Sequence, residues 1–183
     1  MQLLAISGSL RRASTNTALL RGLAAMAAPL AQVTVFEGLG DLPIFNPDNE
    51  GDATPDTVRA FAEAVAAADG IVISCPEYVH ALPGGFKNAL DWLVSRSEII
   101  GKPIALLHAS HRGEDVLADL RRVLSTVSDG FAPEIFANFP MRKMTPEDIS
   151  AHLATPGEAA RLSEFLAAFV GHVRAIQVQD ATG

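Results

Sequence analysis

The sequence predicts an α/β fold in which a doubly wound parallel sheet is covered by helices on both faces. Two observations carry this prediction: short apolar runs recur along the 183 residues, and segments with helical spacing of apolar residues separate them. Uninterrupted apolar runs are typical of strands buried on both faces, and the intervening helices supply right-handed crossovers. There is no internal repeat or linker. We therefore expect one domain over residues 1–176 and a flexible tail over 177–183.

Five apolar runs are the expected strands. Four are rich in aliphatic residues, and the last is weaker because it contains an acidic residue. In chain order they cover residues 3–6, 33–36, 71–73, 104–107 and 134–136. Their alternation with helical segments is what favours a parallel sheet over an antiparallel one.

Apolar residues at helical spacing predict the elements between the strands. The four clearest stripes cover residues 19–27, 86–94, 116–127 and 162–173. Another helix is expected to run to about Ala68, with Thr54 as its N-cap and Pro55 at its first position. Thr145-Pro146 and Thr155-Pro156 are similar start signals for a short helix and for the last helix.

Composition and charge argue against several functional classes. The chain has 21 acidic residues against 14 Lys and Arg, and no basic cluster dense enough for a nucleic-acid partner. No apolar run approaches the ~18 residues of a membrane span. The single cysteine, Cys75, excludes an intramolecular disulfide, and we expect no metal site. Because Met1-Gln2-Leu3-Leu4 has no charged signal region, we expect a cytoplasmic protein.

The loop after the first expected strand, residues 7–17, is rich in hydroxyl and arginine side chains. Backbone N–H groups and the positive end of the helix dipole attract anions at such a place, and hydroxyls and arginines add hydrogen bonds. We expect a phosphate cradle here. The alternative is that Ser14 or Thr15 only caps the helix and the arginines are solvated. The patterns of a P-loop, a dinucleotide fingerprint and a nucleophile elbow are all missing.

The loop after the third strand begins at Cys75 and leads into a helix near Phe86. Its prolines and glycines predict a rigid backbone that can face the edge of a flat ligand, with Tyr78 offering an aromatic face. We expect Cys75 to be a small core residue, with a redox thiol as the alternative. His80 is expected to be solvated, with proton donation to a reduced quinone as the alternative. We expect Trp92 to have a packing role.

These motifs resemble the NADPH-dependent FMN reductase family of flavodoxin-like proteins, which includes FMN, quinone, chromate and azo reductases. The resemblance is carried by Gly8-Ser9-Leu10-Arg11 with Ser14 and Asn16, by Pro76-Glu77-Tyr78, and by Pro83-Gly84 followed by Lys87-Asn88-Ala89 and Asp91-Trp92. The chain departs from the family where Val79 stands in place of a frequent Asn. It also has His111 and Arg112 in a loop that is often glycine-rich.

The resemblance implies a three-layer flavodoxin-like fold with strand order 2-1-3-4-5 and a bound FMN. The residues implied around the FMN phosphate are Ser9, Arg11, Ser14, Asn16 and Thr17. Those implied around the isoalloxazine are Pro76, Glu77, Tyr78 and Val79 on one side and Ser110, His111, Arg112 and Gly113 on the other. No catalytic side chain is expected, because the cofactor carries the chemistry.

The resemblance also implies the partners of the reaction. NADPH or NADH would be the co-substrate, and a quinone, free flavin, chromate or azo compound would be the electron acceptor. Members of the family commonly form dimers or tetramers. Residues 42–47 are expected to form an exposed apolar loop, which is a candidate for the interface between copies or for the wall of a pocket. His111 and Arg112 are candidates for contact with the acceptor or with the NADPH phosphate, and the alternative for Arg112 is a solvated side chain.

Two other functions remain as alternatives. A flavodoxin-type electron carrier would keep the FMN but not oxidise NAD(P)H itself. Flavodoxins usually have a threonine-rich phosphate loop and two aromatic side chains framing the ring, whereas this chain has an arginine-containing loop and only Tyr78 in range. A flavin-free regulatory or structural module is the third possibility.

Overall fold

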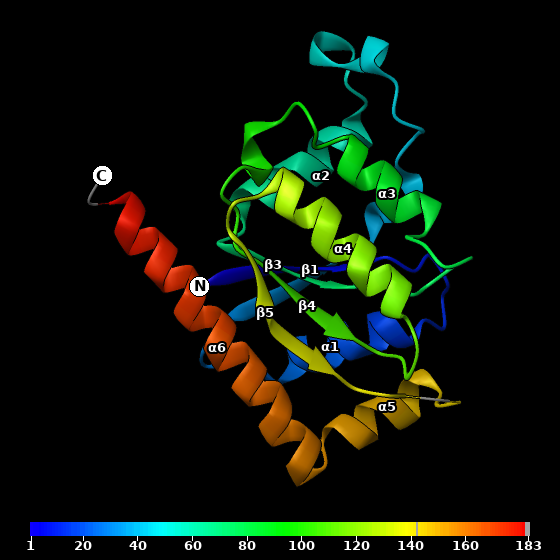
Figure 1. Ribbon diagram of the computed structural model, residues 1–183, viewed down its shortest axis with the longest axis vertical. Coiled ribbons are helices and arrows are strands. Elements are labelled where there is room, and N and C mark those ends of the chain that lie inside the picture. Colours follow the sequence, from blue (N-terminus) through cyan, green and yellow to red (C-terminus); the bar gives the residue numbers. More distant parts are fainter. Residues whose placement is uncertain (142, 182–183) are drawn as a thin grey trace.

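The computed structural model describes residues 1–141 and 143–181, and it contains a five-stranded parallel sheet between two layers of helices (Figure 1). The strands are β1 Gln2–Ser7, β2 Gln32–Phe36, β3 Gly70–Ser74, β4 Ile104–His108 and β5 Phe131–Asn138. Their order in the sheet is β2-β1-β3-β4-β5, and all neighbouring strands are parallel. The expected doubly wound fold and strand order are confirmed.

The helices follow the predicted stripes. They are α1 Thr15–Met26, α2 Asp56–Ala67, α3 Gly84–Asp91, α4 Glu114–Val127, α5 Pro146–Leu153 and α6 Pro156–Asp180. Short 3₁₀ turns occupy Gly38–Asp41, Pro47–Asn49 and Gly51–Ala53 in the long connection before α2, and Ser97–Ile99 before β4. Within the described residues, no helix combines the length and apolarity that crossing a membrane requires.

Two apolar clusters hold the layers together, one on each face of the sheet. Successive side chains of a strand point to opposite faces. In β1, Leu3 and Ala5 therefore pack with α1, α5 and α6, whereas Leu4 and Ile6 pack with α2, α3 and α4. This arrangement explains why the central strands read as continuous apolar runs: both of their faces are covered.

Two helix boundaries differ from the expected ones. The N-cap of α2 is Pro55 rather than Thr54, because Pro55 still has extended backbone angles (φ −61, ψ 147) and Thr54 lies buried before it. At the other end of the chain, α6 continues to Asp180, beyond the start of the expected tail, and Gln177 Nε2 donates to Asp69 Oδ1 at 2.9 Å. Residues 182–183 of that tail lie outside the described residues.

The apolar loop of residues 42–47 is less exposed than expected. Trp92 Nε1 and Asn88 Nδ2 both donate to Pro43 O, at 2.8 and 2.9 Å, and Asn88 Oδ1 accepts from Phe45 N at 2.8 Å. The Phe45 ring meets the buried Trp92 edge-on with centroids 5.1 Å apart, which confirms the packing role of Trp92. Ile44, by contrast, is 81% exposed. The loop is thus anchored by its flanks and presents one large apolar side chain.

The helix expected from the apolar stripe at residues 86–94 is longer at its C-terminal end than the observed helix α3. The helix ends at Asp91, and although Leu93 is buried, Val94 lies in the following turn and is exposed. The helical periodicity no longer applies there because the chain has left the helix.

Candidate functional site

The central strands β1, β3 and β4 have their carboxyl ends on the same side of the sheet, and the direction of the connections reverses between β1 and β3. Open α/β sheets bind ligands beyond the carboxyl ends of the strands at such a switch point. A cavity of about 350 Å³ opens at this edge, and we call it the switch-point pocket. Its lining residues come from the segments after four strands: Thr15, Asn16, Pro76, Glu77, Ala109, Ser110, His111, Arg112 and Met141.

The N-terminus of α1 forms one wall of the switch-point pocket. Ser14 is the N-cap, and its Oγ accepts from Thr17 N at 3.2 Å. The buried Asn16 side chain accepts from Ser74 Oγ at 2.8 Å and so ties the first turn of α1 to the end of β3. The first turn carries no acidic residue. The positive end of the helix dipole is therefore available to an anion in this pocket.

Gly8 allows the β1–α1 loop to lie directly against the end of β3. Gly8 N donates to Ser74 O at 2.9 Å, and a Cβ on Gly8 would lie only 2.3 Å from Cys75 Sγ. Cys75 is almost fully buried, and this burial raises the pKa of its thiol well above the ordinary value. The thiol is therefore neutral and belongs to the core, as expected from the sequence.

Glu77 and His108 fix the loops that form the opposite wall of the pocket. Glu77 Oε2 accepts from Val116 N at 3.1 Å, which links the loop after β3 to the first turn of α4. The buried His108 donates from Nε2 to Arg112 O at 2.6 Å. Desolvation lowers the pKa of His108, with the bond to the Arg112 carbonyl acting in the opposite direction, so the ring is neutral. The residue after Arg112, Gly113, adopts φ +119, and a Cβ there would lie 2.7 Å from the His108 ring.

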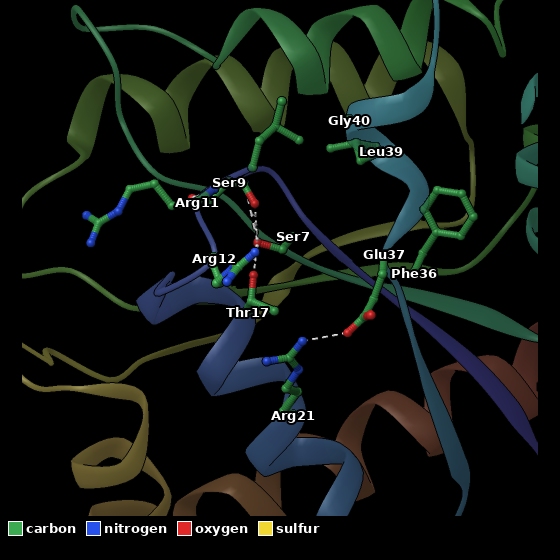
Figure 2. Close-up of a pocket in the computed structure, with 11 residues that line it drawn as sticks. Ser7, Ser9, Arg11, Arg12, Thr17, Arg21, Phe36, Glu37, Leu39 and Gly40 are labelled. Carbon is green, nitrogen blue, oxygen red and sulfur yellow. Dashed lines mark hydrogen bonds and ion pairs between the residues drawn. The ribbon is translucent and has the colours of Figure 1, made fainter.

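The residues expected around FMN divide into three groups. Those that share the switch-point pocket are Asn16, Pro76, Glu77, Ser110, His111 and Arg112. Ser9, Arg11 and Thr17 instead line a second cavity of about 270 Å³ beside α1 and the end of β2, which we call the arginine pocket (Figure 2). Ser14, Tyr78, Val79 and Gly113 line neither of these two cavities.

Three residues of the switch-point pocket were not among the residues expected around FMN: Thr15, Ala109 and Met141. Thr15 lies within the loop of residues 7–17, where it was considered only as a helix cap, and Ala109 directly precedes Ser110. Met141 follows β5, and the position of that loop beside the site depends on the order of the strands rather than on any local motif.

A profile of the family described as NADPH-dependent FMN reductase matches residues 1–141, which is most of the chain and includes β1 through β5. The chain belongs to this family. The resemblance carried by the loops after β1 and β3 is thereby confirmed.

Individual relatives agree with this placement. A quinone reductase of Escherichia coli K12 is 36% identical over 113 residues, which is 60% of either chain. A 2-hydroxy-1,4-benzoquinone reductase of a Burkholderia species is 39% identical over 113 residues, 60% of this chain and 61% of the relative. The matched segment thus spans about three fifths of these relatives. The structure of FerB, a flavoenzyme NAD(P)H:(acceptor) oxidoreductase from Paracoccus denitrificans, shares the fold with a TM-score of 0.74 and 24% identity, covering 95% of this chain and 97% of FerB.

In this member of the FMN reductase family, a strained turn stands beside the site. Tyr78 and Ala81 exchange two backbone hydrogen bonds of 3.1 Å, and the central residues Val79 and His80 have φ angles of +54 and +56. His80 Nδ1 lies 2.6 Å from Asp115 Oδ2. Together with Glu77, these side chains bring three possible metal-ligating atoms within 4.8 Å of one another, an arrangement that the spacing in the sequence did not predict.

Replacing Val79 by asparagine should stabilise the protein. A β-branched residue with positive φ is strained by about 1–2 kcal/mol, whereas Asn tolerates this region. The Val79 side chain is 95% exposed, so little packing is lost. We expect Val79→Asn to raise the free energy of unfolding by about 1 kcal/mol in urea titrations. Val94→Asn, at an exposed valine without positive φ, should not do so. A destabilised Val79→Asn would mean that the valine makes a compensating contact.

Proposed function

We propose that this chain is an NAD(P)H-dependent oxidoreductase that holds FMN in the switch-point pocket and reduces small-molecule acceptors, with quinones as the leading class. The observation that carries the proposal is the convergence of the α1 N-terminus with the loops after β3 and β4 on one cavity of about 350 Å³. This volume is in the range of small-molecule sites. The names of the relatives from Escherichia coli and the Burkholderia species support a quinone as acceptor.

The residues of the pocket fit a phosphorylated flavin. Thr15 and Asn16 lie in the first turn of α1, where the helix dipole and backbone N–H groups favour a phosphate. Across the cavity, Pro76 and Ser110 belong to the two loops that would flank the ring. Arg112 adds a positive charge to the rim. We assign the phosphate to the α1 end and the isoalloxazine to the side of β3 and β4.

The chain itself would bind and orient rather than react. FMN held there would supply the redox chemistry, namely hydride acceptance from the nicotinamide nucleotide and electron delivery to the acceptor. The Glu77 carboxylate, held by Val116 N, fixes the loop on one side of the ring position. His108, held neutral by burial, fixes the loop on the other side through the Arg112 carbonyl. Both walls are therefore preformed by contacts to the body of the protein.

The test begins with FMN binding and continues with reduction. The protein should quench FMN fluorescence with a stoichiometry of one, and anaerobic NADPH or NADH should then bleach the bound flavin without any other protein. Bound flavin that is not bleached would favour a flavodoxin-type carrier. A protein that does not bind FMN would exclude both flavin functions. A panel of benzoquinone, free FMN, chromate and an azo dye then ranks the acceptors.

A variant that fills the switch-point pocket tests whether FMN binds there. Ser110→Trp puts a large ring into the switch-point pocket, whereas Ser125→Trp adds the same ring to an exposed position of α4. We expect Ser110→Trp to weaken FMN binding by more than about tenfold, or ~1.4 kcal/mol, and Ser125→Trp to leave it unchanged. Equal affinities in both variants would move the flavin out of this pocket.

We further propose that copies of this chain associate as a homodimer or homotetramer. The exposed Ile44 supports this, because it stands on a loop whose flanking residues Leu42 and Phe45 are packed into the protein. An apolar side chain presented on so firmly held a loop suits an interface between copies.

A further inference from the structure

Three side chains with metal-ligating atoms meet between the loop after β3 and the first turn of α4. Glu77 and His80 belong to the loop, and Asp115 is the second residue of α4. His80 Nδ1 lies 2.6 Å from Asp115 Oδ2 and 3.8 Å from Glu77 Oε1. The three ligating atoms all lie within 4.8 Å of one another. His80 and Asp115 are 35 residues apart in sequence, so only the folded chain brings this cluster together.

The backbone fixes the starting point of each of these side chains. Glu77 Oε2 accepts from Val116 N at 3.1 Å, and its other oxygen, Oε1, is the one that approaches His80. His80 stands in the turn that the two backbone hydrogen bonds between Tyr78 and Ala81 close. Asp115 is held by α4 itself. A ligand that binds all three residues therefore has to order only their side chains, which keeps its entropic cost low.

The spacing of the three atoms suits a small divalent metal ion. Ligands at 2.0–2.1 Å from a tetrahedral Zn²⁺ lie about 3.3 Å from one another. The distances of 2.6 and 3.8 Å from His80 Nδ1 bracket this value. The side chains of His80 and Asp115 are 82% and 59% exposed, so they can rotate to equalise the distances. Their exposure also lets water complete the coordination.

Charge and donor type favour a metal ion over a proton as the group that joins the cluster. A proton on His80 can be shared with Asp115, but 3.8 Å is too long for a hydrogen bond to Glu77. A divalent cation balances both carboxylates at once, and Glu114 adds a further acidic residue to the same turn of α4. An imidazole nitrogen among the ligands suits Zn²⁺ and similar transition metals, whereas Mg²⁺ and Ca²⁺ prefer oxygen alone.

We propose that Glu77, His80 and Asp115 bind one divalent transition-metal ion of the Zn²⁺ type. The ion clamps the loop after β3 onto α4 and so reinforces the contact that Glu77 already makes with Val116 N. The proposal departs from the expectation, drawn from the sequence, that the chain has no metal site. It does not rest on the proposed function, since no flavin takes part in the binding.

Calorimetric titration of Zn²⁺ into the untagged, flavin-free protein tests the site directly. The titration is run at about pH 7.5, because imidazole ligates metals in its neutral form. We expect one ion per chain. His80→Asn removes the imidazole while tolerating the positive φ of this position, and Asp115→Asn removes a carboxylate at nearly constant size. Each should weaken Zn²⁺ binding by at least about tenfold, because each removes one of three protein ligands.

Two matched variants separate ligation from general effects of charge and of histidine. Glu114→Gln removes a carboxylate from the same turn of α4 but outside the cluster, and His152→Asn removes a histidine on α5. Both should bind Zn²⁺ with nearly the affinity of the unmodified protein. Mg²⁺, as the hard dication, should bind the unmodified protein at least about tenfold more weakly than Zn²⁺.

Thermal unfolding adds a second readout. A ligand that binds only the folded state raises its stability, so Zn²⁺ should raise the Tm of the unmodified protein. It should raise the Tm of His80→Asn much less, because that variant lacks the imidazole ligand.

Three results would overturn the assignment. The first is the absence of Zn²⁺ binding, and the second is binding that His80→Asn leaves unchanged, which would place the ion elsewhere. The third is equal weakening by Glu114→Gln and Asp115→Asn, which would indicate diffuse attraction to an acidic turn. A failure of the proposed function looks different: the protein would then not bind FMN, while the Zn²⁺ titration of the flavin-free protein would keep its outcome.

Discussion

Replacing Trp92 by alanine should lower the free energy of unfolding by about 3–5 kcal/mol, the range for deleting a large buried aromatic side chain. The Trp92 side chain is fully buried, packs edge-on against Phe45 and donates to Pro43 O at 2.8 Å. The variant loses apolar contact with the core and one of the bonds that fix the loop of residues 42–47. Urea unfolding followed by circular dichroism measures the loss.

A conservative variant separates the two contributions. Trp92→Phe keeps most of the ring volume, and Pro43 O still accepts from Asn88 Nδ2 at 2.9 Å. We therefore expect Trp92→Phe to lose only about 1–2 kcal/mol. If Trp92→Ala lost no more than Trp92→Phe, packing around the indole would contribute little and this description of the loop would be wrong.

Replacing Gly8 by alanine should damage both stability and FMN binding. The new methyl group would stand 2.3 Å from Cys75 Sγ and 3.1 Å from Cys75 Cβ, so the β1–α1 loop has to move away from the end of β3. Overpacking of this kind costs about 1–3 kcal/mol. The same movement shifts the N-terminus of α1 relative to the loop that carries Pro76 and Glu77. We therefore expect the FMN affinity to fall by at least about tenfold, or ~1.4 kcal/mol.

A double variant and a matched glycine control this experiment. Cys75→Ala removes the closer clashing atom, so combining it with Gly8→Ala should recover at least about 0.5 kcal/mol relative to the sum of the two single changes. Gly84→Ala, in the first turn of α3 with open space around it, should leave FMN binding unchanged. Additive effects of Gly8→Ala and Cys75→Ala would show that this contact does not position the loop.

The expected fold followed from patterns that are local in the chain. The apolar runs at residues 3–6, 71–73 and 104–107 are buried on both faces because each strand lies between neighbours under two helical layers. Burial of a strand or of a helix stripe imposes a period on the sequence that can be read without knowing the partners. The start signal Thr145-Pro146 was also reliable because it is local in the chain: its capping box forms within four residues.

The loop motifs after β1 and β3 were sufficient to place the chain in its family and to locate the switch-point pocket. They could not show that Arg11 and Arg12 line a different cavity from Pro76 and Glu77. That division depends on the side of the β1–α1 loop on which each side chain lies. It also depends on the ion pair between Arg21 of α1 and Glu37 after β2. No local periodicity encodes either arrangement.

The sequence alone therefore determined the layers, the strand order through the family resemblance, and the edge of the sheet where the candidate site lies. Only the tertiary structure decided how the site is held: Gly8 against Cys75, Glu77 on Val116 N, and His108 on the Arg112 carbonyl. The physical reason is distance along the chain. Burial patterns arise residue by residue, whereas two of these contacts join loops that are far apart in sequence and meet only when the parallel strands are aligned.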